Sequence, residues 1–112
     1  MTSDISTLAN WIRTSDSTVF FGGAGVSTES GIPDFRGANG FYFQERTIPL
    51  EQVLSIDFFS LHPEAYWDWF REVHKPVEPN GAHRALASLE SSGLLECVIT
   101  QNIDGLHQRA GS

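Results

Sequence analysis

Thr-Val-Phe-Phe-Gly-Gly-Ala-Gly-Val-Ser-Thr-Glu-Ser-Gly-Ile-Pro-Asp-Phe-Arg-Gly, residues 18–37, is the stretch that decides the fold. Its first four residues are β-branched or aromatic without alternation, which predicts a short strand covered on both faces. Gly22, Gly23 and Gly25 then remove the Cβ atoms where the chain turns. A helix that begins at such a turn offers unpaired backbone N–H groups and a positive dipole end, which suit a phosphate.

The glycine turn departs from the ordinary dinucleotide-binding fingerprint. Counting Gly-x-Gly-x-x-Gly from Gly23 places Thr28 at the third glycine position. No clear acidic strand end follows about 20 residues later. The Gly-x-Gly pattern alone is therefore compatible with a phosphate-binding turn and also with a plain tight turn.

Composition excludes several classes of partner and site. The chain has 112 residues, 40% of them hydrophobic, which suits one small globular domain. Its net charge of −7 argues against nucleic acid or an anionic membrane as a partner and favours a basic peptide. The single cysteine, Cys97, excludes an internal disulfide and cannot alone form a cysteine-rich zinc site, and its apolar neighbours predict a buried position in a strand. With no membrane-length apolar run and no signal-peptide pattern, we expect a cytoplasmic protein.

Apolar residues at helical spacing predict three longer helices. The first is capped by Ser3 or Asp4, and its apolar side should lie on the sheet. The second opens with Pro63, and its aromatic residues are typical of a core, although they also suit an acyl or peptide groove. The third is capped by Asn80 and ended by Gly93.

Residues 34–47 are rich in glycine, asparagine and aromatic residues and show no sustained period. An irregular segment of this length in a compact domain usually has a function or is mobile, although a surface loop with packed aromatics also fits. Phe41, Tyr42 and Phe43 are expected to anchor its far end.

A second strand is predicted at residues 95–100, again apolar and followed by polar residues. Strand, helices and strand in this order indicate a right-handed crossover between parallel strands. The polar stretch after each strand would then lie at a carboxyl end, which is where an open α/β sheet binds its ligands. Two strands by themselves make a marginal sheet.

Two longer stretches resemble the signatures of the sirtuin family of NAD-dependent protein deacylases. The first is Gly23–Ser27 followed by Glu29–Arg36, and the second is Thr100–Ser112. Looser similarity covers the rest of the chain and looks most like the bacterial branch. The resemblance implies an α/β fold, the N-terminal half of a Rossmann-like doubly wound parallel sheet. Residues 1–112 would be a partial NAD-binding domain.

The resemblance also implies the reaction. An acyl-lysine oxygen attacks the ribose carbon that carries nicotinamide, the acyl group ends on ADP-ribose, and NAD is consumed. The expected partner is an acyl-lysine protein or peptide. The cofactor-binding residues implied are Gly23, Ala24, Gly25, Thr28, Phe35, Arg36, Gln101, Asn102, Ile103 and Asp104.

Individual roles follow from the family pattern. The glycine turn, Thr28 and Arg36 would meet the diphosphate, and Phe35 would cover the reactive ribose carbon. Gln101 and Asn102 would supply amides for the ribose hydroxyls and an ordered water. The Ile103 backbone and Asp104 would hold the nicotinamide carboxamide, and Asn102 and Asp104 are the expected catalytic residues.

Simpler interpretations exist for the same residues. Asn102 and Asp104 follow a strand and suit an Asx turn or an N-cap for a helix over residues 105–110, which spacing alone favours. None of the four histidines falls where the family has its general base. His107 is the histidine expected near the site, either as a catalytic group or as a structural hydrogen-bonding residue.

In the family, the general-base histidine, a four-cysteine zinc module and the second half of the sheet come after the segment that corresponds to residues 110–112. The sequence contains none of them. We therefore expect a fragment that is inactive alone, with zinc only in a longer parent protein. Two alternatives are a non-catalytic module that binds NAD or ADP-ribose, and an NAD hydrolase or ADP-ribosyltransferase of the same fold. The sequence leaves the oligomeric state open.

Overall fold

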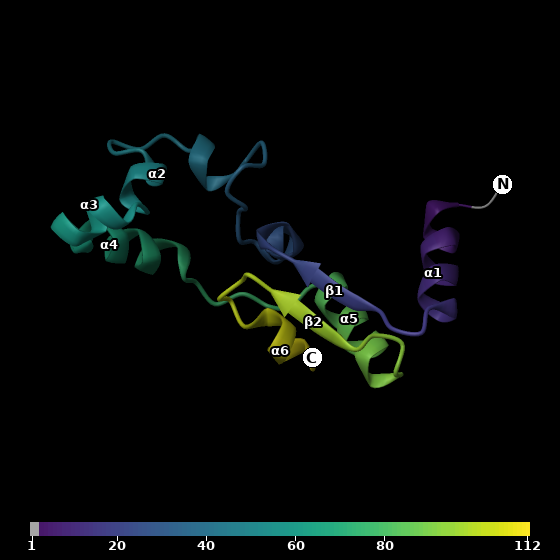
Figure 1. Cartoon of the computed structure of the whole chain (residues 1–112). Coiled ribbons are helices and arrows are strands. Elements are labelled where there is room, and N and C mark those ends of the chain that lie inside the picture. Colours follow the sequence, from purple (N-terminus) through teal and green to yellow (C-terminus); the bar gives the residue numbers. More distant parts are fainter. Residues whose placement is uncertain (1–2) are drawn as a thin grey trace. The chain divides into compact units, whose positions relative to one another are not determined.

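The computed structural model describes residues 3–112, which divide into two compact units. The first unit comprises residues 3–26 and 79–112, and the second comprises residues 27–78. Figure 1 labels the helices and strands of both units along the chain. No helix within residues 3–112 combines the length and the apolar character needed to cross a bilayer.

A two-stranded parallel sheet forms the centre of the first unit (Figure 1). Its strands are β1 (Val19–Gly22) and β2 (Cys97–Thr100), in a register that pairs the first residue of β1 with the first residue of β2. The parallel pairing confirms the direction predicted from the order of strand, helices and strand. The helices of this unit are α1 (Asp4–Thr14), α5 (Gly81–Ser91) and α6 (Leu106–Ala110).

Helix α1 begins at the predicted N-cap, where Ser3 Oγ accepts the backbone N–H of Ser6 at 3.1 Å. Its apolar stripe is exposed, and Trp11 keeps 63% of its surface. The expectation that this helix lies on the sheet is therefore wrong within the described residues. Helical spacing shows that a helix has an apolar stripe, but it does not show what covers that stripe.

One face of the sheet is also uncovered. Val19, Phe21 and Ile99 are exposed on this face, as is Cys97. Both the predicted cover on two faces and the predicted burial of Cys97 are therefore wrong within residues 3–112. An apolar run without alternation fits a strand buried on both faces, but the covering elements must come from elsewhere in the fold.

The opposite face of the sheet is partly covered. Phe20 of β1 points to this face, where its ring centroid lies 6.0 Å from that of His107 in α6. The fully or nearly fully buried apolar residues of this unit are Ala87, Leu95 and Leu106. Helices α5 and α6 thus supply the small core that positions the end of β2.

Short helices make up the second unit. The 3₁₀-helix η1 (Ala24–Ser30) begins in the first unit and ends in the second. The second unit also contains η2 (Phe41–Phe43), α2 (Leu50–Val53), α3 (Ile56–Leu61) and α4 (Pro63–Val73). Proline at the first position of α4 agrees with the predicted start.

The second unit has its own hydrophobic core. Phe41, Leu50 and Val53 form its centre, and Tyr66 and Trp69 of α4 pack against it. This packing confirms the predicted core role of the α4 aromatics and the predicted anchor at Phe41 and Tyr42. The predicted anchor at Phe43 is wrong, because Phe43 is 69% exposed. Residues 34–40 contain no helix or strand, as the lack of period predicts.

Candidate functional site

Two loops meet at one end of the parallel sheet in the first unit. β1 runs into the glycine turn and β2 runs into residues 101–105, so both loops leave the carboxyl ends of their strands. Gln101 N–H donates to the carbonyl of Gly22 at 3.1 Å, which extends the strand pairing by one step. The side-chain amide of Asn102 then donates from Nδ2 to the carbonyl of Gly23 at 2.9 Å. The two signature stretches are therefore joined directly.

The three glycines of the turn have different surroundings. A Cβ added to Gly22 would overlap the ring of Phe20, and one added to Gly23 would lie 3.3 Å from Oε1 of Gln101. A Cβ at Gly25 would meet nothing within 4 Å. Packing therefore demands glycine at position 22, whereas the backbone at Gly25 borders open space.

Asp104 and Asn102 hold the second loop in different ways. Asp104 Oδ1 accepts the backbone N–H of Leu106 at 3.0 Å, which supports the first turn of α6 as the Asx-turn interpretation predicts. The N-cap of α6 is Gly105, so the N-cap interpretation is wrong for both side chains. Asn102 Nδ2 donates to the Gly23 carbonyl. The side chain of Ile103, between them, is 75% exposed. Gly105 has φ +71°, a conformation that favours glycine, and it turns the chain into α6.

The other predicted site residues, Thr28, Phe35 and Arg36, belong to the second unit. The ring of Phe35 packs against Phe41 and Tyr42, with centroid distances of 5.5 and 5.4 Å. The Arg36 guanidinium lies over the Tyr42 ring, 5.2 Å from its centroid, as a cation–π contact.

Backbone bonds close this segment on itself. Phe41 N–H donates to Asp34 O at 2.7 Å, and Tyr42 N–H donates to Phe35 O at 3.0 Å. A Cβ at Gly40 would lie 2.6 Å from the Phe35 carbonyl oxygen, so glycine permits this close approach. The structure thus presents the predicted residues as two sets, one in each unit.

Two buried histidines lie next to the second loop. His83 and His107 are 0% and 2% exposed, and their rings meet edge to face with centroids 4.8 Å apart. Within residues 3–112, neither ring nitrogen of His107 has a hydrogen-bond partner. The expectation that His107 is a structural hydrogen-bonding residue is therefore wrong; the side chain packs through its ring. The alternative that it is a catalytic group has no test here.

His83 was not anticipated as part of this region. Its Nδ1 accepts the backbone N–H of Asn80 at 3.0 Å and completes a capping box. Burial lowers the pKa of His83, the neighbouring His107 and Arg84 lower it further, and Asp104 raises it. The signal in the sequence was the three-residue spacing after the cap, with histidine in the place where glutamate or glutamine is usual.

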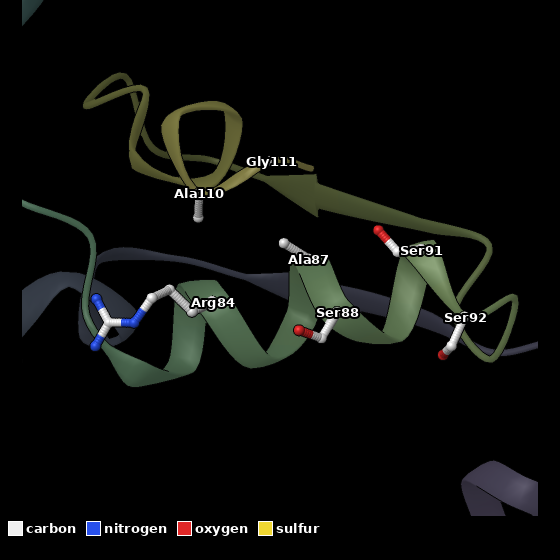
Figure 2. A pocket seen from close by; sticks show the side chains of 7 residues that line it. All are labelled: Arg84, Ala87, Ser88, Ser91, Ser92, Ala110 and Gly111. Carbon is white, nitrogen blue, oxygen red and sulfur yellow. The ribbon is translucent and has the colours of Figure 1, made fainter.

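A groove of about 600 Å³ lies elsewhere in the first unit, formed by α5 and the end of α6 (Figure 2). It is lined by Arg84, Ala87, Ser88, Ser91, Ser92, Ala110 and Gly111. None of the sequence-predicted site residues lines it. Within residues 3–112 there is also no group of three or more histidine, cysteine or acidic side chains that could hold a metal ion.

Comparison with known proteins gives the family. Residues 23–112 match the model of the Sir2 family, which is most of the chain. The chain belongs to the Sir2 family. An NAD-dependent protein deacetylase of Cutibacterium acnes is 55% identical over 109 residues, which cover 94% of this chain and 45% of that relative. An NAD-dependent protein deacetylase of Clostridium perfringens is 49% identical over 116 residues, which cover 100% of this chain and 48% of that relative. This Sir2-family chain thus spans about half the length of the curated relatives it matches.

Solved Sir2 structures have the same fold over this length. A structure described as the basis for the mechanism and regulation of Sir2 enzymes superimposes with a TM-score of 0.90 at 47% identity, covering 100% of this chain and 44% of the solved one. A Sir2 complex with a p53 peptide and NAD⁺ superimposes with a TM-score of 0.81 at 46% identity. The match covers 98% of this chain and 43% of the solved one. The predicted α/β sirtuin fold with a parallel sheet is confirmed.

Proposed function

We propose that this Sir2-family chain is part of an NAD-dependent protein lysine deacylase. The proposed enzyme transfers the acyl group of an acyl-lysine substrate to ADP-ribose and releases nicotinamide. The observation that carries the proposal is the bond from Asn102 Nδ2 to Gly23 O, because it places the glycine turn beside the polar loop at the ligand-binding end of a parallel sheet. Relatives named as NAD-dependent deacetylases support it.

The first unit would bind the diphosphate and the nicotinamide ribose. Backbone N–H groups of Gly23, Ala24 and Gly25 would face the diphosphate, and the open space at Gly25 supports this placement. Asn102 and Asp104 would act at the nicotinamide end, with Gln101 and the backbone of Ile103 beside them. The hydrogen bonds of Asn102 and Asp104 to the backbone orient their side chains, as positioning of reacting groups requires.

The second unit would supply the cover and one charge. Phe35 would exclude water from the reactive ribose carbon, and Arg36 and Thr28 would contribute to diphosphate binding. The aromatic contacts of Phe35 and the stacking of Arg36 on Tyr42 support a preformed segment that can serve as such a cover.

The remaining parts of the proposed enzyme would come from a longer parent protein. These are the general-base histidine, the zinc module and the second half of the sheet. Residues 1–112 would then form one partial NAD-binding domain that is inactive alone, from a cytoplasmic enzyme of bacterial type. The net charge of −7 favours acyl-lysine sites in basic peptides.

A chimera tests the proposal. In this deacetylase chimera, the chain replaces the matching segment of the Cutibacterium acnes deacetylase. Incubated with NAD and an acetyl-lysine peptide, it should release nicotinamide and form acetyl-ADP-ribose, which mass spectrometry detects. Nicotinamide with free or protein-linked ADP-ribose would instead support a hydrolase or transferase. A folded chimera that binds NAD without reaction would support the binding-module alternative.

A further inference from the structure

We propose that His83 and His107 are positioning residues: a buried imidazole pair that fixes the Asn102–Asp104 loop against the end of the glycine turn. The expected effect of the pair on kcat rests on the proposed function, whereas its expected effect on the stability of the loop does not. The two histidines lie on α5 and α6, beside the loop that carries Asn102 and Asp104. They act through the loops that carry those groups.

The first half of the connection runs through the start of α5. Asn80 Nδ2 donates to the carbonyl of Val26 at 2.8 Å, which ties the helix to the glycine turn. Asn80 Oδ1 accepts the N–H of Ala82 at 2.9 Å, and Asn80 N–H donates to His83 Nδ1 at 3.0 Å. The hydrogen bonds of Asn80 therefore fix the His83 ring relative to the glycine turn.

The second half runs through the start of α6. His107 follows Leu106, whose N–H donates to Asp104 Oδ1, so the ring and the loop share one helix turn. The His107 ring meets the His83 ring at 4.8 Å with 74° between the planes, and the Phe20 ring of β1 at 6.0 Å. This contact between imidazoles links α5 to α6 beside the site.

Burial opposes protonation of His83 and lowers its pKa. The groups that face His83 are His107 on α6, Asp104 on the loop and Arg84 on α5, and only Asp104 favours the charged form.

The contact between the rings also gives a reason for histidine instead of leucine at position 107. In an edge-to-face pair, the N–H edge of one ring can point at the face of the other, which is a directional contact that an aliphatic side chain does not make. Leucine would fill the space without that direction. A merely structural role therefore predicts that leucine is tolerated, and the positioning role predicts that it is not.

The kinetic test uses the deacetylase chimera with His83→Gln, His107→Leu and His107→Phe. Glutamine keeps an acceptor for the Asn80 N–H, and both replacements at 107 keep buried bulk. We expect kcat to fall roughly 10–100-fold in His83→Gln and His107→Leu, because small displacements of positioned groups cost this much, with little change in KM for the peptide. His107→Phe should have a higher kcat than His107→Leu, because a phenyl ring keeps an edge-to-face contact with His83. The matched control is His62→Gln, an exposed histidine.

The acid side of the pH profile gives an independent readout. In the unmodified chimera, kcat should fall at acidic pH as His83 is forced to protonate, and this acid-side fall should change in His83→Gln. A kcat and a pH profile that match those of the unmodified chimera in both His83→Gln and His107→Leu would overturn the proposal.

A structural measurement separates this inference from the proposed function. Amide hydrogen exchange of the 112-residue chain, followed by NMR, reports the Leu106 N–H that binds Asp104. In His83→Gln and His107→Leu it should exchange roughly 10-fold faster or more, while the amides of β1 stay protected. Unchanged exchange at Leu106 in both folded variants would overturn the proposal even if the chimera is active. An inactive chimera with faster Leu106 exchange would contradict only the proposed function.

Discussion

The side-chain amide of Asn102 donates to the backbone carbonyl of Gly23, 79 residues earlier in the chain, at 2.9 Å. This bond joins the loops that follow the two strands, and it depends on the parallel register that brings the strand ends together. It fixes the two loops relative to each other. Substitutions at and around it therefore test stability and function separately.

Asn102→Ala should lower the free energy of unfolding of the 112-residue chain by about 1 kcal/mol, because one part-buried hydrogen bond is lost. Urea unfolding measures this change. Asn10→Ala on α1 is the matched control, and as an exposed substitution it should stay within about 0.5 kcal/mol of the unmodified chain. Equal midpoints for the two variants would show that the bond to Gly23 contributes nothing to stability.

Asp104→Asn in the deacetylase chimera should cost more in turnover and nicotinamide exchange than Arg36→Lys. The asparagine keeps an oxygen for the Leu106 N–H, so the fold is preserved while the charge at the proposed nicotinamide end is lost. Lysine keeps a positive charge for the phosphates and loses the guanidinium geometry and the stacking on Tyr42. Steady-state kinetics with both variants decide the order, and the reverse order would contradict the role given to Asp104.

Gly25→Ala and Gly22→Ala should separate ligand binding from folding. Alanine at position 25 meets nothing within 4 Å, so stability should hardly change, while NAD should bind the chimera more weakly because the methyl group fills the open space. Alanine at position 22 should destabilise the fold, because the Phe20 ring that contacts His107 must move. Thermal unfolding and NAD titration of both variants measure the two effects. Unweakened NAD binding by Gly25→Ala would count against the phosphate role of the turn.

His83 should make the free energy of unfolding depend on pH. Its pKa is lowered in the folded chain from the ordinary value of 6.5, first by burial and then by His107. Well above pH 6.5 the residue is neutral in both states and adds no dependence. As the pH falls below this value, the unfolded chain takes up a proton that the folded chain resists, so the free energy of unfolding falls.

Urea midpoints of the 112-residue chain between about pH 5 and pH 8 test this sign. His83→Gln should flatten the fall below pH 6.5, and the exposed His62→Gln should leave it unchanged. A profile that falls equally in all three proteins would assign the dependence to other groups.

Much of the local structure could be predicted from residues that restrict the backbone. Pro63 at the start of α4 and Asn80 at the cap of α5 were predicted, because proline and side-chain capping act on the nearest backbone atoms. The two strands and the loops after them could be located from the sequence, whereas the binding roles of those loops depended on the resemblance to the sirtuin family, because the glycine pattern alone also fits a plain tight turn. These signals all act within a few residues.

The remainder depends on contacts between distant segments. The uncovered stripe of α1 and the exposure of Cys97 could not be predicted, because an apolar pattern indicates that cover is needed and not which element supplies it. The pair of His83 and His107 was missed for a related reason. Their contact depends on how α5 packs against α6, and neither histidine has a spacing that indicates a partner 24 positions away.

Cys97 has a practical consequence as the single thiol of the sequence, placed on the uncovered face opposite Val19 in the register of the sheet. An exposed thiol reacts with alkylating dyes through its thiolate, so the chain accepts one fluorophore at one known point without mutagenesis. Labelling should be rapid in the 112-residue chain and slower in any assembly that buries this face. The rate of dye incorporation then reports whether the apolar surface around Val19 and Ile99 is buried by another part of an assembly.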